Sequence, residues 1–324
     1  MKEPIYLSKE TGVPLLRFIW KWKVVSTAGL TLRFFSHMKY PSSPYDYLSR
    51  LRDAHYLVST RASEEGRGYL WSLDRAGFEA IRNSLPELRE VGYKAEYREH
   101  DWLVTSFHLG EWLVGCPAGV QVFSEQLLRR LEPDHYPLWV PKSSGHRADG
   151  YWHRMDQGTP RTIALEVELN RKKGTTYQGV GSFYGESAQV GRVLWVVPAL
   201  LDALFIQKNL DKGPGSRTGI HSFVILDSFL KQGWSGLIEY GPGKGLSIET
   251  FLSKALGTFC DSFVTPSRLR GVTMALLDTR LKRVQSVPYG LGSEGQISRL
   301  TTASAVVAPA PLEIRTHVQP EVSL

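Results

Sequence analysis

The sequence predicts an α/β protein of the α+β kind, in which a helical unit ending in a β-hairpin precedes a core of helices packed on a sheet. The first observation is helix-like apolar spacing over 14–54, followed by two β-like stretches before residue 74. The second is the order beyond residue 119: a helix, two or three strands, a helix, a strand, a helix and a strand, typical of a layered sandwich. With 42% hydrophobic and 22% charged residues, the 324-residue chain suits a folded protein of about two domains.

Three helices are expected in the N-terminal unit. The first, over 14–25, carries apolar residues at the spacing of a buried helix face. The second begins at the capping residues Ser26 and Thr27 and runs to about residue 36. The third covers 45–54, with Ser43 as a cap and Pro44 at a first helical position, where its missing N–H costs nothing.

A β-hairpin should follow these helices. The stretches 56–60 and 69–73 are β-like, and the turn between them, over 61–68, is rich in Gly, Glu and Arg. Three helices followed by a hairpin with a basic tip is the element order of a winged helix-turn-helix. In that fold the third helix enters the major groove of DNA. The residues expected to contact DNA are Ser43, Tyr45, Tyr47, Arg50, Arg52, Arg61 and Arg67.

The charge distribution supports contact with a polyanion. Residues 1–61 hold ten basic and four acidic residues, so nearly all of the net charge of +7 lies there. A unit of this kind can also serve as a protein-interaction module with a solvated basic face, and that alternative stays open. The two cysteines have no ligand spacing, and we find no apolar run of about 18 residues and no signal-peptide core. We therefore expect a soluble cytoplasmic protein that makes no membrane contact.

Beyond the N-terminal unit, the sequence predicts a connector and a core. Strands or hairpins are expected over 139–152, 162–169, 192–197 and 222–226, and the intervening helices include one that Ser124 caps and one over 200–209. A last helix is expected over 248–259. The predicted divisions are 1–86 for the N-terminal unit, 87–118 for the connector, 119–265 for the core, and 266–324 for a C-terminal extension that is largely disordered after about 303.

The most informative segment, residues 147–173, carries three acidic residues that can act together: Asp149, Glu166 and Glu168. Asp149 stands in an Asp-Gly pair, and Glu166 and Glu168 share one face of a strand because successive side chains point to opposite faces. Such carboxylates can hold a divalent cation, and the basic run 171–173 can neutralise a phosphate. Carboxylates that bind a metal ion and basic side chains that bind a phosphate are the groups that metal-assisted cleavage of a phosphodiester requires. The plainer alternatives are an amphipathic strand with its polar face in water and an Asp-Gly turn.

The element order and the motif Asp149 … Glu166-Val-Glu168 resemble the PD-(D/E)XK nuclease superfamily, whose shared core is αβββαβ. The chain from about 14 to 230 is also similar to the replication-relaxation family of plasmid and mobile-element proteins, and to the mobilisation relaxases of that lineage. The stretches that carry this likeness are Leu70-Trp-Ser-Leu-Asp-Arg-Ala-Gly77, His100-Asp101, Phe123-Ser-Glu-Gln-Leu127, Arg147-Ala-Asp-Gly150 and Leu165-Glu-Val-Glu-Leu-Asn-Arg171.

The resemblance implies a protein that binds double-stranded DNA, such as a plasmid origin, and nicks or cuts it with Mg²⁺ (or Mn²⁺) in mobilisation or replication initiation. Asp149, Glu166 and Glu168 would bind the metal and activate water, with Glu125 as a further metal-binding carboxylate and Lys172 beside the scissile phosphate. A relaxase of the usual kind forms a phosphotyrosyl bond, so Tyr177 or Tyr184 is a candidate nucleophile, although packing is the commoner role of such residues.

Two departures from the superfamily pattern leave alternatives open. Ala148 stands where Pro is usual, and Glu168 stands where Lys is usual, although some members use Glu at that position. A second register, Glu168-Leu-Asn170, stays open, and Lys172 or Lys173 can supply the absent cation. The competing hypothesis is therefore a non-catalytic DNA-binding regulator or replication accessory factor with a degenerate core. His100 is expected to cap a helix or donate a hydrogen bond. The number of subunits stays open, a homodimer included.

Overall fold

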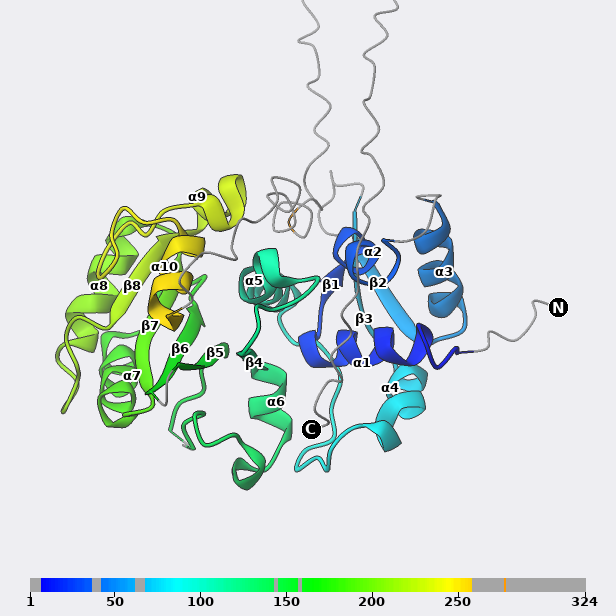
Figure 1. The fold of residues 1–324 in the computed structure, drawn as a ribbon, viewed down its shortest axis with the longest axis horizontal. Helices are drawn as coiled ribbons and strands as arrows, with labels where there is room; N and C mark the ends of the chain where they lie inside the picture. The colour runs from blue at the N-terminus through cyan, green and yellow to red at the C-terminus, as the bar shows by residue number, and fades with distance from the viewer. Residues whose placement is uncertain are drawn as a thin grey trace, which may run out of the picture.

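The computed structural model describes residues 7–36, 42–61, 68–142, 145–156, 159–257 and 277. It contains two sheets with helices packed around them, so the expected α/β class is confirmed. An N-terminal unit lies beside a larger α/β core (Figure 1). None of the helices in these ranges is long and apolar enough to cross a membrane.

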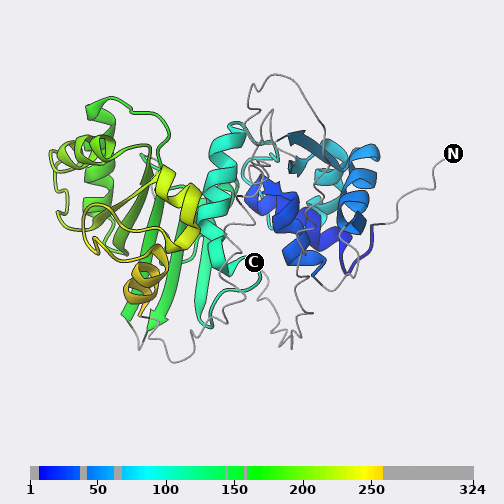
Figure 2. The ribbon, with the colours of Figure 1, turned by 90° about the horizontal axis from the view of Figure 1, so that it is seen from above.

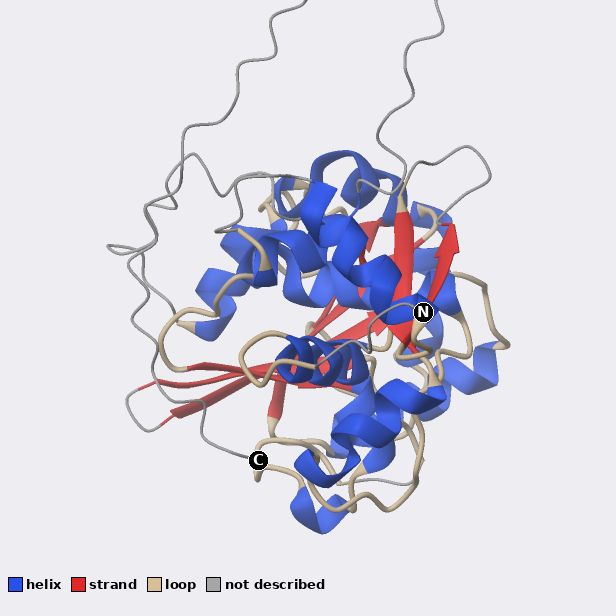
Figure 3. Ribbon diagram, turned by 90° about the vertical axis from the view of Figure 1, so that its right-hand side faces the viewer, coloured by secondary structure: helices blue, strands red, loops and turns tan. Residues whose placement is uncertain are grey.

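The N-terminal unit folds around a three-stranded antiparallel sheet of order β1-β3-β2. Buried apolar side chains from its helices and strands, among them Leu16, Leu51 and Trp71, form its core. Figure 3 views the protein from the side of this unit, with its strands in red among blue helices. Its elements are α1 (Gly12–Trp22), β1 (Val25–Ser26), α2 (Thr27–Phe34), α3 (Ser42–Asp53), β2 (Leu57–Arg61), β3 (Tyr69–Leu73) and α4 (Arg75–Ile81).

Two details of this unit differ from the sequence prediction, and part of the prediction lies outside the described residues. The short strand β1 was not expected; it pairs Val25 with Trp71 across the sheet. Helix α3 begins at Ser42, so Ser43 lies inside the first turn and was wrongly predicted to precede the helix as its cap. The tip of the predicted hairpin, including Arg67, lies outside the described residues, as does the side chain of Ser43.

The core contains a five-stranded sheet of order β4-β5-β6-β7-β8. Neighbours among the first three strands are antiparallel, whereas β6-β7 and β7-β8 are parallel. Parallel neighbours need a crossover, which α7 and α8 supply. The strands are β4 (Val120–Ser124), β5 (Gly150–Asp156), β6 (Thr159–Val167), β7 (Val190–Val197) and β8 (His221–Ile225), and the crossover helices are α7 (Gly174–Glu186) and α8 (Leu200–Leu210).

Helices cover both faces of this sheet because its central strands are apolar on both sides. Side chains such as Ala164 and Val193 pack with α7 and α8, whereas Leu165 and Leu194 pack with α5, α9 and α10. The layers are visible in Figure 2, where α5 lies between the sheet and the N-terminal unit. The remaining helices are α5 (Arg98–Leu109), α6 (Glu125–Arg130), α9 (Leu226–Gln232) and α10 (Ile248–Leu256), and the short 3-10 turns lie at 82–84, 110–112, 133–135 and 233–235.

Several predicted boundaries of the core were wrong. Strand β4 was not expected, and the strand placed over 139–152 begins only at Gly150, where pairing with β4 and β6 starts. Strand β6 ends at Val167, so Glu168 follows it directly. Helix α10 ends at Leu256 because Gly257 adopts a left-handed conformation (φ 71°) that terminates the helix. Of the predicted C-terminal extension only Leu277 is described, so the expected disorder lies outside the described residues.

Candidate active site

Asp149 lies against the end of β6, between the two glutamates. Its backbone N–H donates to the carbonyl oxygen of Leu165 (2.9 Å), and its Oδ2 accepts a hydrogen bond from the backbone N–H of Val167 (2.7 Å). Val167 separates Glu166 from Glu168 in the chain, so the three carboxyl groups gather at one end of the sheet. The pKa of Glu168 reflects this: burial raises it, Lys172 lowers it, and the charges of Asp149 and Glu166 raise it, with a net upward shift.

Glu166 is held by two hydrogen-bonding side chains. Its Oε1 accepts a hydrogen bond from the hydroxyl of Tyr184 and lies 2.6 Å from Nε2 of His146. Burial alone would lower the pKa of His146, but the charge and hydrogen bond of Glu166 outweigh burial and raise it. His146 therefore pairs with Glu166, a contact that the sequence did not indicate.

Lys172 lies at the second glutamate. Its Nζ is 2.9 Å from Oε2 of Glu168, and its backbone N–H donates to the hydroxyl of Tyr177 (2.9 Å). Lys172, which the sequence analysis named as a candidate cation, thus lies beside Glu168. Both candidate tyrosines, Tyr177 and Tyr184, are buried. Burial raises the pKa of Tyr177 to about 12 and that of Tyr184 well above its ordinary value, so both hydroxyls stay protonated.

His100 connects Asp149 to α5. Its Nε2 lies 3.5 Å from Oδ2 of Asp149 and 3.1 Å from the carbonyl oxygen of Val167, and its Nδ1 lies 3.7 Å from Oδ1 of Asp101. Burial opposes the charge of His100, but Asp101 and Asp149 outweigh it and raise its pKa to about 11. His100 does not cap α5, whose N-cap residue is Tyr97, so the expected capping role was wrong and the hydrogen-bond role holds.

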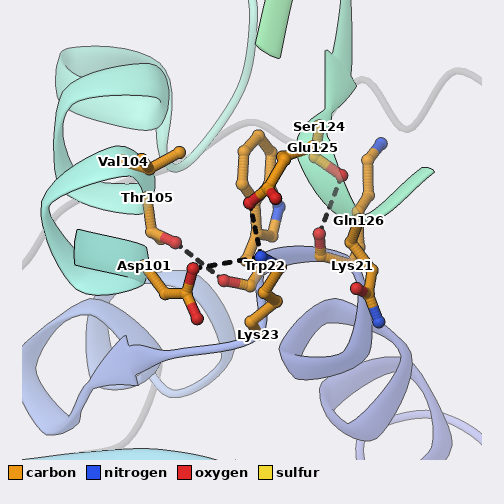
Figure 4. Close-up of a pocket in the computed structure, with 9 residues that line it drawn as sticks. All are labelled: Lys21, Trp22, Lys23, Asp101, Val104, Thr105, Ser124, Glu125 and Gln126. Carbon is orange, nitrogen blue, oxygen red and sulfur yellow. Dashed lines mark hydrogen bonds and ion pairs between the residues drawn. The ribbon is translucent and has the colours of Figure 1, made fainter. Parts of the chain in front are cut away.

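Glu125 points toward the N-terminal unit. Ser124 caps α6, accepting a hydrogen bond from the backbone N–H of Leu127 (3.5 Å), which places Glu125 in the first helical turn. Oε2 of Glu125 accepts a hydrogen bond from Nζ of Lys23, which also donates to Oδ1 of Asp101 (3.0 Å) (Figure 4). Burial raises the pKa of Glu125, Lys23 lowers it, and the charge of Asp149 raises it, so Glu125 and Asp149 interact electrostatically.

Each carboxylate described above pairs with a Lys or His side chain. Lys23 pairs with Asp101 and Glu125. The other pairs are His100 with Asp149, His146 with Glu166, and Lys172 with Glu168. Carboxylate oxygens are the ligands that Mg²⁺ prefers. Within the ranges that the structure describes, no group of three or more His, Cys, Asp or Glu side chains is arranged to hold a metal ion.

The predicted DNA-contacting residues divide into exposed and packed side chains. Arg50 and Arg61 are exposed, and Arg52 is half-buried beside Asp53 (3.0 Å). Tyr45 lies 5.4 Å from the ring of Tyr69. Tyr47 turns inward: its ring packs 5.6 Å from Phe35, and its hydroxyl is buried without a hydrogen-bond partner. The guanidinium of Arg61 interacts with Tyr69, a residue that the sequence analysis did not select.

No family model, curated protein or solved structure matches the chain.

Proposed function

We propose that this protein binds double-stranded DNA through its N-terminal unit. We further propose that it cleaves a phosphodiester bond with a divalent metal ion at the acidic cluster, by which we mean Asp149, Glu166 and Glu168. The proposed setting is mobilisation or replication initiation of a plasmid or mobile element, as the family resemblance implies. The observation that carries the proposal is the hydrogen bond from Val167 to Asp149, because it gathers Asp149, Glu166 and Glu168 at one end of β6.

The order of elements supports the resemblance to the PD-(D/E)XK superfamily. A helix (α5), three antiparallel strands (β4, β5, β6), a helix (α7) and a parallel strand (β7) follow one another in the chain, with α6 inserted after β4. The acidic residues stand where the second and third of these strands meet. A fold alone does not determine function, so the weight rests on the side chains.

The donor set suits Mg²⁺ or Mn²⁺. Asp149, Glu166 and Glu168 supply only hard carboxylate oxygens, and all three are at least partly buried. These residues would hold the ion, which when bound neutralises phosphate charge and lowers the pKa of a bound water. His146 and Lys172 now neutralise Glu166 and Glu168. They would have to share these carboxylates with the ion or move toward the phosphate.

The surrounding side chains have assignable roles in this proposal. Lys172, which is more than half exposed at its side chain, is placed to bind a phosphate oxygen close to Glu168. Tyr184 orients Glu166 through its hydroxyl. We assign neither Tyr177 nor Tyr184 as the nucleophile, because both are buried and their phenolic pKa values are raised. Direct attack by water suits this arrangement better than a phosphotyrosyl intermediate.

A second candidate is a DNA-binding regulator or replication accessory factor whose core does not cleave. The ion pairs of the acidic cluster favour it. Each carboxylate is already paired with a Lys or His side chain, as in a purely structural polar network, and Glu125 is bonded to Lys23.

Supercoiled plasmid incubated with Mg²⁺ or Mn²⁺ separates the two candidates. The wild type is compared with Asp149→Ala and with a matched control, Asp227→Ala, which removes an exposed acid of α9. Duplex binding is measured in parallel by electrophoretic shift. Open-circle product from the wild type and the control, with none from Asp149→Ala, supports cleavage. Equal binding by all three proteins without any nicking supports the regulator. Absence of DNA binding contradicts both.

A further inference from the structure

Lys23 lies in an unusual position at the junction of the two parts of the protein. It follows the end of α1, and its side chain is buried, with 7% of its surface exposed. Its backbone has φ 60° and ψ −50°, a conformation that residues with a side chain rarely adopt. Strain of this kind persists only where surrounding contacts fix the chain. The side chain of Lys23 bonds two residues of the core, Asp101 and Glu125.

The end of α1 is bonded to the core at three consecutive residues. The hydroxyl of Ser124 donates to the carbonyl oxygen of Lys21 (2.8 Å), and the hydroxyl of Thr105 donates to that of Trp22 (2.8 Å). Nζ of Lys23 donates to Asp101 and Glu125, as Figure 4 shows. Core side chains therefore bond the terminal carbonyls of α1, which lack partners within the helix.

A continuous series of polar contacts leads from Lys23 to the acidic cluster. Oδ1 of Asp101 contacts both Nζ of Lys23 (3.0 Å) and Nδ1 of His100 (3.7 Å). Nε2 of His100 in turn lies 3.5 Å from Oδ2 of Asp149. That same carboxylate oxygen accepts the hydrogen bond of the Val167 amide.

We propose that Lys23 is a positioning residue for Asp149, acting through Asp101 and His100, so that the N-terminal unit sets the geometry of the acidic cluster. The inference deepens the proposed function, on which it rests for its biological meaning. It means that the proposed DNA-binding unit and the proposed cleavage site are linked through the contacts of Lys23, Asp101 and His100.

The physical basis is competition for His100. Asp101 and Asp149 lie on opposite sides of one imidazole ring. Lys23 donates to Oδ1 of Asp101, which leaves His100 available to Asp149 and to the carbonyl of Val167. Asp101 contacts two basic side chains, Lys23 and His100. When Lys23 is removed, His100 is the one of these two that remains beside the buried Asp101 carboxylate. The ring is then drawn toward Asp101, and Asp149 loses the contact that holds its carboxylate against β6.

Hydrogen exchange of the Val167 amide in the full-length protein tests this. In Lys23→Met we expect the Val167 amide to exchange at least about tenfold faster than in the wild type, because its acceptor has moved. Thr105→Val is the matched control: it removes a hydrogen bond of the same junction but leaves the charged series intact, and Val167 should exchange as in the wild type. Lys23→Arg, which keeps the charge, should restore most of the protection.

Two results overturn the proposal. One is an unchanged Val167 amide in a folded Lys23→Met. The other is equal acceleration in Thr105→Val, which would mean that any loosening of the junction has this effect. If Lys23→Met does not fold, Asp101→Asn replaces it. This variant removes the charge that competes with Asp149 for His100, so the Val167 amide should stay as protected as in the wild type, and accelerated exchange there also overturns the proposal. No metal, DNA or nicking enters the measurement, so a failure of the proposed function is seen separately.

Discussion

The side chain of Asp149 accepts a hydrogen bond from the backbone N–H of Val167 at 2.7 Å, directly between Glu166 and Glu168. A carboxylate thereby takes the place of a backbone acceptor at the point where β6 stops pairing with β5. The same contact lowers the pKa of Asp149: burial raises it, but His100 and the Val167 amide outweigh burial. This hydrogen bond therefore lies where the strand pairing ends and, after His100, contributes to lowering the pKa of the buried Asp149 carboxyl.

Two glycines of α7 should respond in opposite ways to replacement by alanine. A Cβ at Gly181 would lie 2.3 Å from the backbone carbonyl oxygen of Leu210 in α8, whereas a Cβ at Gly179 meets no atom within 4 Å. Gly181→Ala should therefore lower the free energy of unfolding by about 1–3 kcal/mol through overpacking. Gly179→Ala should raise it by roughly 0.5–1 kcal/mol, because glycine is a poor helix residue. Urea denaturation of the two variants checks both signs, and stabilisation by Gly181→Ala would contradict the close packing of α7 on α8.

Loss of Lys23 should destabilise the protein far more than loss of a surface lysine. Lys23→Met leaves two carboxylates, Asp101 and Glu125, without their ammonium partner in a buried site. Removing one member of a buried ion pair typically costs about 3–5 kcal/mol. The matched control is Lys231→Met, which breaks an exposed pair with Asp227 on α9 and should cost less than about 1 kcal/mol. Equal unfolding midpoints for the two variants would argue against the charged junction.

The acidic residues of the candidate site could be selected from the sequence because the signal is local. Alternation over 165–169 places Leu165 and Val167 on one face and the glutamates on the other, and the structure buries the two apolar residues on the α5 side. The end of α10 could also have been predicted from the sequence, because Gly257 is a typical helix-terminating glycine. The predicted helix wrongly continued through this glycine to residue 259. Strand β4 was missed because five residues carry too little periodicity to separate a strand from a loop.

The partners of those acidic residues could not be selected, because they come from distant segments. Lys23 and Asp101 are 78 residues apart, and His146 and Glu166 are 20 apart, with strand β5 and most of β6 between them. A single histidine or lysine has no periodic context that would identify its partner. The His100-Asp101 pair was visible as a motif, but its contact with Asp149 depends on how α5 packs against the end of β6. Tertiary packing, not local pattern, determines these ion pairs.

Binding of duplex DNA should depend on the exposed arginines of the N-terminal unit and on salt. Arg50 on α3 and Arg61 at the end of β2 are both exposed. If each contacts a phosphate, the double variant Arg50→Ala/Arg61→Ala should reduce the slope of log K against log salt by about 1.8, since each contact contributes about 0.9. Arg192→Ala, an exposed arginine of β7, is the control and should leave the slope unchanged. Fluorescence anisotropy over a range of salt concentrations measures this, and an unaltered slope in the double variant would place the DNA elsewhere.

The protein should lose stability as the pH falls below about 6.5, because burial lowers the pKa of several histidines, His108 and His221 most strongly. Burial lowers the pKa of His108 to about 3, and burial with repulsion from Arg217 lowers that of His221 to about 3. An unfolded histidine has a pKa of about 6.5. Between these values the unfolded state binds more protons, so stability rises with pH and falls on acidification, by up to about 1.4 kcal/mol per pH unit for each histidine.

His221→Asn isolates one of these contributions. The Nδ1 of His221 accepts a hydrogen bond from Nε1 of Trp195 (3.1 Å), and the side-chain oxygen of asparagine can accept the same bond without titrating. The free energy of unfolding, measured in urea at several pH values between 5 and 6.5, should therefore depend less steeply on pH in the variant, by up to about 1.4 kcal/mol per pH unit. His100 has the opposite sign: its raised pKa of about 11 gives stability that is fully present below pH 6.5 and is lost only as the pH rises toward 11. It therefore does not mask the acid effect, and an identical pH slope in wild type and His221→Asn would show that His221 is not buried as a neutral ring.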